Sequence, residues 1–166
     1  MKSKKILLSF LILFIIIFMI GLSCANTNNL KISYLGFNHI ILIFLVNFFT
    51  IFICLLLTPT GISYIIILKI IFTIGYSSKT ALIPLYIYLP ISLIHGIFEI
   101  TCIYIVYKLT TLYWINYLSK NNNKYEVFLN LLKKTYLKYL PFICLLLVIG
   151  AILEVMVSNK LINYLI

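Results

Sequence analysis

The chain of 166 residues has almost no acidic side chains and no arginine: it contains three glutamates, no aspartate and thirteen lysines, for a formal net charge of +10. A basic balance of this size often indicates nucleic-acid binding. Arginine, the residue best suited to phosphates and base edges, is absent here, and the lysines lie between apolar runs. The charge therefore argues against a nucleic-acid partner and predicts contact with lipid headgroups.

Motifs for metal binding and catalysis are also missing. The four cysteines form no CxxC pair and no Cys/His metal spacing, and each falls in or at the edge of an apolar run, as small buried side chains do. There is no HExxH motif, no glycine-rich phosphate loop and no serine/histidine dyad with a recognisable elbow. We therefore expect no enzymatic activity, no metal and no cofactor.

Hydrophobic residues are what the chain has in excess: they make up 64% of it, and its mean hydropathy is +1.17. Soluble domains are about 45–50% apolar, so the lipid bilayer is the solvent that suits this chain. The pattern predicts an all-α membrane helical bundle, one integral domain with about five transmembrane helices. The expected spans are residues 6–22, 39–57, 62–76, 84–107 and 141–157.

Three of these apolar runs contain or adjoin a signal for cleavage, a turn or a kink. The first is followed by the tripeptide SCA at 23–25, which resembles a signal-peptidase site, but it is long for a signal peptide, so we expect a retained signal anchor. The second is closed by TPTG at 58–61, a predicted tight turn. Pro84 and Pro90 interrupt the fourth and predict a kink or an interfacial half-helix before the span.

Residues 108–140 separate the last two spans and include a basic amphipathic segment. From Tyr125 to Tyr139 a helical projection gathers apolar side chains on one arc and lysines on the other. This pattern predicts a helix lying on the leaflet surface, with a solvated cytoplasmic helix as the alternative.

The lysines also predict orientation. With five spans and the N-terminus inside, nine lysines fall on the inner side and three on the outer side, which matches the positive-inside rule. The inner lysines are 2, 4, 5, 108, 120, 124, 133, 134 and 138, and the outer ones are 31, 79 and 160.

Five polar residues lie within the expected spans: Asn47, Lys69, His95, Glu99 and Glu154. A charge at the bilayer centre costs on the order of 3 kcal/mol, so we expect these side chains to face one another inside the bundle. His95 and Glu99 are four residues apart and share a helix face. The hypothesis is a buried network in which Lys69 pairs with Glu99 while His95 bridges toward Glu154.

Three interpretations of this network stay open. It fixes helix register as interhelical polar contacts, it forms a transport or proton path, or His95, Glu99 and Glu154 are the ligands of an intramembrane metalloprotease. Beside His95, Gly96 is predicted to let a neighbouring helix approach closely.

The segment LIHGIFEI at 93–100, preceded by a proline-containing half-helix, resembles the HGxxE segment of the stage II sporulation protein M (SpoIIM-like) family. Asn47 in IFLVNFF resembles the family's asparagine near the start of an early span. The segments TGISYIIILKIIFTIGY (60–76) and AILEVMVSNKL (151–161) are similar to the family's following helix and its glutamate-bearing closing segment.

The resemblance implies a multi-pass protein of the bacterial cell membrane without known catalytic activity. The family's namesake anchors a sporulation complex with peptidoglycan-degrading partners, and small relatives beside circular bacteriocin genes are linked with maturation, export or immunity. A scaffold or accessory role beside other membrane proteins of an envelope or bacteriocin export complex is thus expected, with homo-oligomerisation left open. The alternatives are a small transporter or permease component and, less favoured, a metalloprotease.

Overall fold

The structure is a computed structural model that describes residues 2–25, 35–80, 84–119 and 123–165. Its elements are α1 (Lys2–Cys24), α2 (His39–Leu56), the 3-10 turn η1 (Thr58–Thr60), α3 (Ser63–Thr80), α4 (Leu85–Leu118), α5 (Lys124–Lys134), the π-helical turn η2 (Thr135–Tyr139), α6 (Leu140–Leu153), the π-helical turn η3 (Glu154–Ser158) and α7 (Asn159–Leu165). Every regular element within these ranges is helical, which confirms the all-α class. Lys31 and Lys120, which enter the orientation count, lie outside the described residues.

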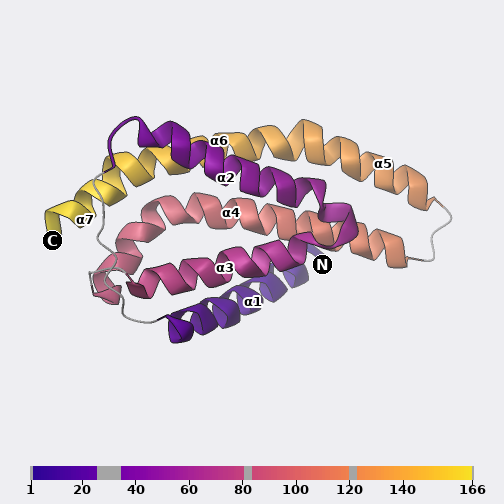
Figure 1. The fold of residues 1–166 in the computed structure, drawn as a ribbon. Coiled ribbons are helices and arrows are strands. Elements are labelled where there is room, and N and C mark those ends of the chain that lie inside the picture. The colour runs from indigo at the N-terminus through magenta and orange to yellow at the C-terminus, as the bar shows by residue number, and fades with distance from the viewer. Residues whose placement is uncertain (1, 26–34, 81–83, 120–122, 166) are drawn as a thin grey trace.

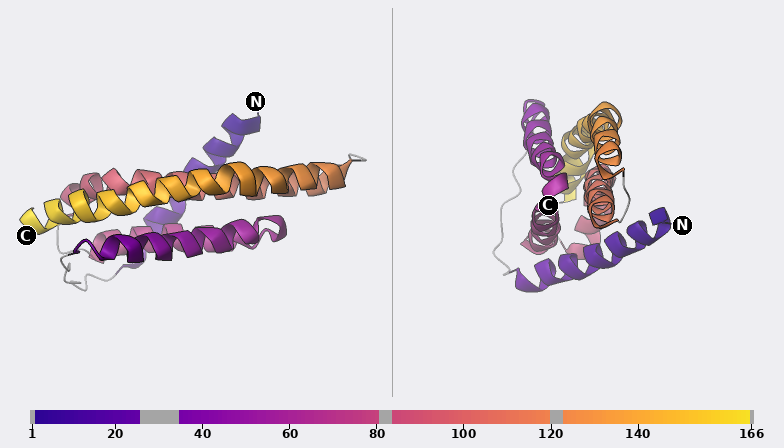
Figure 2. Two further views of the ribbon diagram at one scale, coloured as in Figure 1. Left: turned by 90° about the horizontal axis from the view of Figure 1, so that it is seen from above. Right: turned by 90° about the vertical axis from the view of Figure 1, so that its right-hand side faces the viewer.

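The helices form an elongated bundle in which consecutive long helices run in opposite directions (Figure 1). The N-terminus of α1 lies toward the end where α4 and α5 meet, and the C-terminus lies at the opposite end. Most helices are nearly parallel, whereas α1 crosses the bundle obliquely and packs mainly against α3 (Figure 2).

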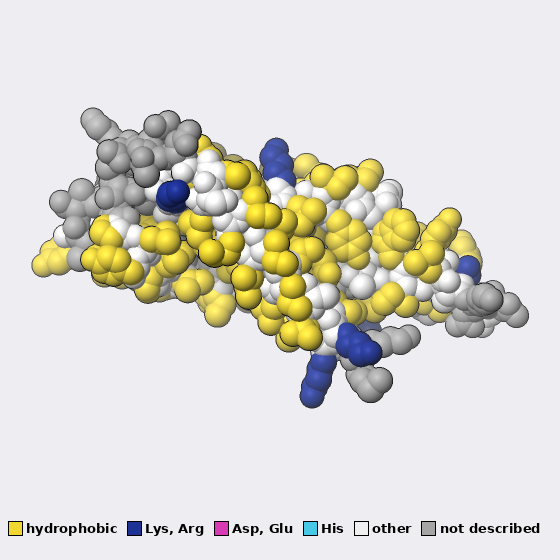
Figure 3. All heavy atoms as spheres, turned by 90° about the horizontal axis from the view of Figure 1, so that it is seen from below, with side chains coloured by type: hydrophobic (Ala, Val, Ile, Leu, Met, Phe, Trp, Pro, Cys, Tyr) yellow, Lys and Arg dark blue, Asp and Glu magenta, His cyan; other side chains and the backbone are white. Residues whose placement is uncertain are grey.

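Within the described residues, four helices are long and apolar enough to cross a membrane: α1, α2, α4 and the last long helix. They contain the predicted spans 6–22 and 141–157 in full, and the spans 39–57 and 84–107 except for residues 57 and 84. The remaining predicted span, 62–76, lies within α3 except for its first residue, but α3 is not among the four. Two lysines and a hydroxyl-rich last turn make α3 less apolar than its neighbours. Hydrophobic side chains cover much of the molecular face seen in Figure 3, as expected for a bundle whose solvent is lipid.

The last two spans are longer than predicted. α4 continues to Leu118 as a single helix of 34 residues, and it contains Pro90 without breaking. Its N-terminal part bends (Figure 1), which agrees with the predicted kink. Residues Lys124–Tyr164 form one continuous helix of 41 residues, from α5 through η2, α6 and η3 into α7.

This continuity corrects the expectation of a separate helix on the leaflet surface. α5 runs on in line with α6 (Figure 2) and packs against the C-terminal part of α4. Pro141 in the first turn of α6 does not end the helix. The π-helical turn η2 directly precedes α6. Such a turn shifts the register of the backbone hydrogen bonds, and the shift falls next to Pro141, which has no N–H to donate.

The predicted turn at 58–61 is confirmed. Thr58–Thr60 form η1, and Gly61 follows with φ of 78°, a left-handed conformation that glycine adopts without strain. The indole of Trp114 packs so close to Gly61 that a Cβ there would collide with it. The turn between α2 and α3 is therefore held against α4.

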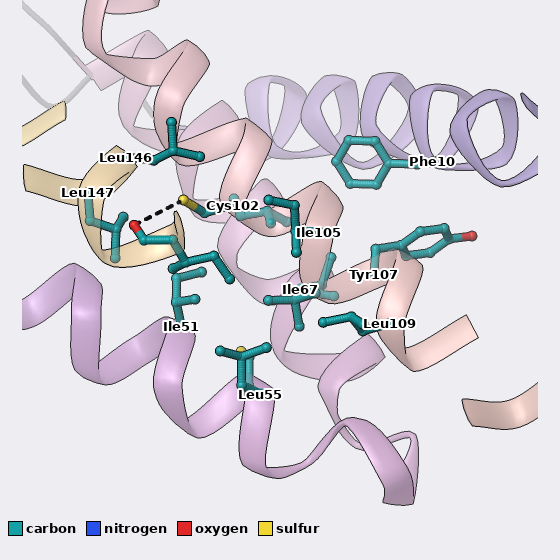
Figure 4. Close-up of a cluster of buried hydrophobic side chains, with 14 of the residues drawn as sticks. Phe10, Ile51, Leu55, Ile67, Cys102, Ile105, Tyr107, Leu109, Leu146 and Leu147 are labelled. Carbon is teal, nitrogen blue, oxygen red and sulfur yellow. Dashed lines mark hydrogen bonds between the residues drawn. The ribbon is translucent and has the colours of Figure 1, made fainter. Parts of the chain in front are cut away.

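The hydrophobic core lies in the half of the bundle toward the N-terminus of α1, and we call it the packed half. Figure 4 shows its side chains converging from α1, α2, α3, α4 and α6. They include Phe10, Ile51, Cys54, Leu55, Ile67, Ile71, Cys102, Val106, Leu109, Ile143 and Leu147, all less than 9% exposed. The Cys102 thiol contributes only a long contact, 3.9 Å from its Sγ to the Ile143 carbonyl oxygen.

α1 and α3 cross at two glycines. A Cβ on Gly21 would collide with the backbone of Phe72, and a Cβ on Gly75 would collide with the backbone of Phe18. Each glycine thus admits the other helix to backbone contact. The same role was predicted for Gly96 and is wrong there, because no described residue outside its own helix lies within 4 Å of a Cβ at Gly96.

Candidate functional site

A stripe of polar side chains runs along the N-terminal half of α4. Tyr88, Ser92, His95 and Glu99 are spaced by four, three and four residues, so they share one face of the helix. All four line a pocket of about 430 Å³ between α1, α3, α4 and η3, which we call the polar pocket. Glu154, at the start of η3, lines the same pocket.

A second space lies on the other side of the same side chains. A groove of about 330 Å³ between α2, α4 and η3 is lined by His95, Glu99 and Glu154 together with Asn47 of α2 and three apolar residues. We call it the side groove. The histidine and the two carboxyl groups border both spaces.

Glu99 is held by α2. The Asn47 side chain donates a hydrogen bond from Nδ2 to Glu99 Oε1 at 2.6 Å. This bond joins the middle of α2 to the middle of α4 and satisfies one carboxyl oxygen in a half-buried position. An amide donor thus occupies the place beside Glu99 that was predicted for the Lys69 ammonium.

His95 is held by η3. Its Nδ1 lies 2.9 Å from Ser158 Oγ, and the Ser158 hydroxyl donates to the Ile91 carbonyl oxygen at 3.1 Å. A serine hydroxyl has one proton, so both bonds form together only when Nδ1 carries hydrogen and donates to Ser158. In the neutral ring Nε2 is then the acceptor nitrogen.

The local backbone explains how Glu154 and Ser158 reach α4. They begin and end η3, a π-helical turn within the last long helix. A π turn widens the helix and redirects its side chains, and such turns are frequent at functional sites. η3 packs directly against α4.

The structure thus brings together four of the five predicted polar residues, and Lys69 is the exception. Asn47, His95, Glu99 and Glu154 meet around the polar pocket and the side groove. Lys69 is exposed on the surface of α3, and no ion pair joins it to Glu99. The predicted Lys69–Glu99 pair is wrong because buried Ile67 and Ile71 turn that face of α3 inward and leave Lys69 outside.

His95 also differs from its predicted bonding. Its hydrogen bond goes to Ser158, and Glu99 one turn along the helix bonds to Asn47. Glu154 was predicted to approach His95, and both side chains line the polar pocket.

The ligand set of the metalloprotease alternative is not assembled. Among the described residues, no three His, Cys, Asp or Glu side chains lie close enough together to hold a metal ion. Four free cysteines are spread over α1, α2, α4 and α6. The absence of enzymatic activity stays a prediction.

The site residues that escaped the sequence analysis include Tyr88, Ser92 and Ser158. The first two could have been found by extending the spacing of His95 and Glu99 backward along α4. Ser158 follows Glu154 by four residues, the same interval that linked His95 to Glu99. Small hydroxyl side chains carry little signal in an apolar span because they also bond to their own helix, as Ser92 does to the Leu89 carbonyl.

A second candidate surface lies at the other end of the bundle, where α4 and α5 form a helical hairpin. Tyr113 and Phe128 pack edge to face with ring centroids 5.6 Å apart, and Tyr113 Oη lies 3.2 Å from Thr135 Oγ1. Near the tip, Lys124 donates to the Tyr117 carbonyl oxygen at 3.0 Å. These contacts make the hairpin an ordered extension of the bundle.

The hairpin surface is basic and apolar at once, and we call residues 108–119 and 123–138 the lysine hairpin. Its exposed lysines are Lys124, Lys133, Lys134 and Lys138. Its most exposed apolar and aromatic side chains are Tyr117, Leu118, Tyr125 and Leu137, at 71–76%. Glu126 is its single described carboxylate.

No known protein family, characterised protein or solved structure matches this chain. The resemblance of LIHGIFEI and its companions to the SpoIIM-like family therefore stays a prediction.

Proposed function

We propose that the chain is a non-enzymatic, multi-pass membrane protein that serves as a scaffold or accessory factor for an envelope complex or for bacteriocin maturation, export or immunity. In this proposal α3 is a fifth crossing, the N-terminus lies inside, and the lysine hairpin faces the cytoplasm. The SpoIIM-like resemblance supplies the class of role, and the hairpin supplies the contact surface.

The length of the hairpin is the observation that carries the proposal. A helix of 34 residues such as α4 is about 51 Å long, whereas the hydrocarbon core is about 30 Å thick. About 20 Å of α4 therefore extends beyond the core. α5 accompanies it over this extension, with lysines beside exposed aromatic side chains, and this combination suits an acidic, amphipathic partner segment.

The packing of the packed half favours a scaffold function and argues against a channel function. Ile71, Cys102 and Val106 are fully buried between the polar pocket and the end of the bundle that bears the hairpin. Side chains packed in this way leave no room for a solute. The helices are fixed relative to one another, which is what a docking platform requires.

In-cell photocrosslinking tests this proposal. A photoreactive residue replaces Tyr125, which is 74% exposed at the hairpin tip, and the matched control replaces Tyr164, which is 88% exposed near the C-terminus. We expect a discrete crosslinked protein from position 125 only, weakened by the joint variant Lys133→Glu and Lys134→Glu. Crosslinking from neither position, or from Tyr164 alone, would contradict the scaffold role of the hairpin.

The polar pocket favours a second candidate, a small transporter or permease component. Its two glutamates and a histidine line a space of about 430 Å³, and intramembrane ionisable groups often mark substrate paths. This function predicts ion or peptide flux in vesicles that Glu99→Gln abolishes while the protein still inserts. The scaffold function predicts no flux in the wild type.

A further inference from the structure

Lys69 lies on an outward face of α3. It is exposed, as are Ile65, Thr73 and Tyr76, and these positions recur at intervals of four and three residues. Such spacing places them on one side of the helix. We call the exposed side formed by Ile65, Lys69, Thr73 and Tyr76 the outer face of α3.

Lys69 lies at the depth of the middle of the bundle. The next residue, Ile70, lines a small cavity together with Asn47, Glu99 and Ile103, so Lys69 is level with the central turns of α4. With α3 in the bilayer, as the proposed function has it, the ammonium group starts well inside the hydrocarbon. An insertion cost of about 3 kcal/mol applies to a lysine at such a position.

Nothing in the described part of the chain offsets this cost. The Lys69 ammonium has no hydrogen-bond or ion-pair partner there, and the bond near it runs from the Thr73 hydroxyl to the Lys69 carbonyl oxygen. Glu99 and Glu154 border the polar pocket inside the bundle. A charge that faces lipid is stabilised by an opposite charge, and we look for that charge outside this chain.

We infer that the outer face of α3 docks a transmembrane helix of another protein, one that carries a carboxylate level with Lys69. The apolar residues on either side of Lys69 give the contact surface, and the ammonium–carboxylate pair gives its register. This inference deepens the proposed scaffold function and depends on it, because it requires α3 to lie in the membrane.

A second copy of this chain fits the face less well. A symmetric dimer through the outer face of α3 would set Lys69 near Lys69, which repels. The chain's third carboxylate, Glu126, lies on the lysine hairpin and not at membrane depth in the proposed topology. Charge complementarity therefore selects a different membrane protein.

The test measures energy transfer in phosphatidylcholine vesicles between the full donor-labelled chain and acceptor-labelled leucine–alanine transmembrane peptides. One peptide has a single glutamate near its centre, and its control has glutamine there. We expect the wild type to prefer the glutamate peptide by about threefold to about fifteenfold, the range given by polar contacts between membrane helices. Lys69→Met should remove the preference, and Lys79→Met, at the end of α3, should retain it.

Equal transfer to both peptides by the wild type would overturn the inference. So would transfer between two copies of the chain that Lys69→Met removes, because that result assigns the face to a second copy. A membrane-impermeant amine reagent separates the two proposals. Modification of Lys69 places it in water and contradicts both α3 as a crossing and the docked helix; protection of Lys69 without a peptide preference contradicts only the docked helix.

Discussion

The same helices run through both halves of the bundle, yet the halves are built differently. In the packed half, side chains such as Cys54, Val106 and Ile143 are fully buried and fill the space between helices. In the other half, α4 presents polar side chains to a pocket of about 430 Å³. One half is a dry core, and the other combines polar groups with open space.

The two halves therefore contribute differently to the stability of the bundle. Close packing without voids fixes the helices, because each buried atom gains contacts that a cavity would forfeit. The polar half has fewer such contacts, and it contains polar side chains whose burial in apolar surroundings costs free energy. A chain that needed only to fold would fill this half with Leu and Ile, and the polar half is where the alternative transporter function would have its site.

The largest effect should come from emptying the packed half. Phe10 is 1% exposed and contacts the rings of Tyr104 and Tyr107, with centroids 5.4 Å away in both cases. Phe10→Ala should lower the free energy of unfolding by about 3 to about 5 kcal/mol, because it leaves a cavity under α1. Detergent-titration unfolding in mixed micelles measures the change.

The matched control is Phe142→Ala, whose ring is 49% exposed on the bundle surface. Its loss should be well under that of Phe10→Ala, since no enclosed cavity forms. Similar losses for the two variants would mean that the packed half is not the main source of stability.

A smaller effect should follow from adding one methyl group where α1 crosses α3. Gly75→Ala places a Cβ against the Phe18 carbonyl oxygen, and the two helices must then separate. Overpacking of this kind costs about 1 to about 3 kcal/mol, which the same unfolding measurement resolves. The loss should also appear as weaker association of separately expressed α1 with the rest of the chain.

Gly96→Ala is the counterpart in the polar half. Within the part of the chain that the structure describes, its Cβ would meet nothing within 4 Å outside its own helix, and alanine favours a helix interior over glycine by up to about 1 kcal/mol. This variant should be neutral or slightly stabilising. A penalty equal to that of Gly75→Ala would show that the space beside Gly96 is closed.

The sequence predicted the long apolar helices because bilayer thickness fixes how long such a helix must be. Four of the five predicted spans, 6–22, 39–57, 84–107 and 141–157, lie to within one residue inside helices that are long and apolar enough to cross. It also placed His95, Glu99 and Glu154 together, since a shared helix face and a cost for isolated charges leave few other arrangements.

The outward turn of Lys69 could not be predicted from hydropathy. α3 carries isoleucine at 65, 66, 67, 70, 71 and 74, which covers all sides of the helix and hides which side faces inward. Only the packing of Ile67 and Ile71 against the core decides it. The continuity of α5 with α6 was hidden as well, because Pro141 is a usual signal for a helix start and η2 accommodates it inside a longer helix.

The smallest predicted loss of stabilising free energy concerns the hydrogen bond between Asn47 and Glu99. A double-mutant cycle with Asn47→Leu, Glu99→Leu and the combined variant should give a coupling free energy of about 0.6 to about 1.7 kcal/mol, as between other membrane helices. Glu99→Gln is the matched control, because its amide oxygen still accepts from Asn47 Nδ2 and should keep most of the coupling. A coupling free energy as large as the loss from Phe10→Ala would mean that the polar half contributes as much to stability as the packed half. A coupling near zero would leave Glu99 free of any role in holding α2 to α4.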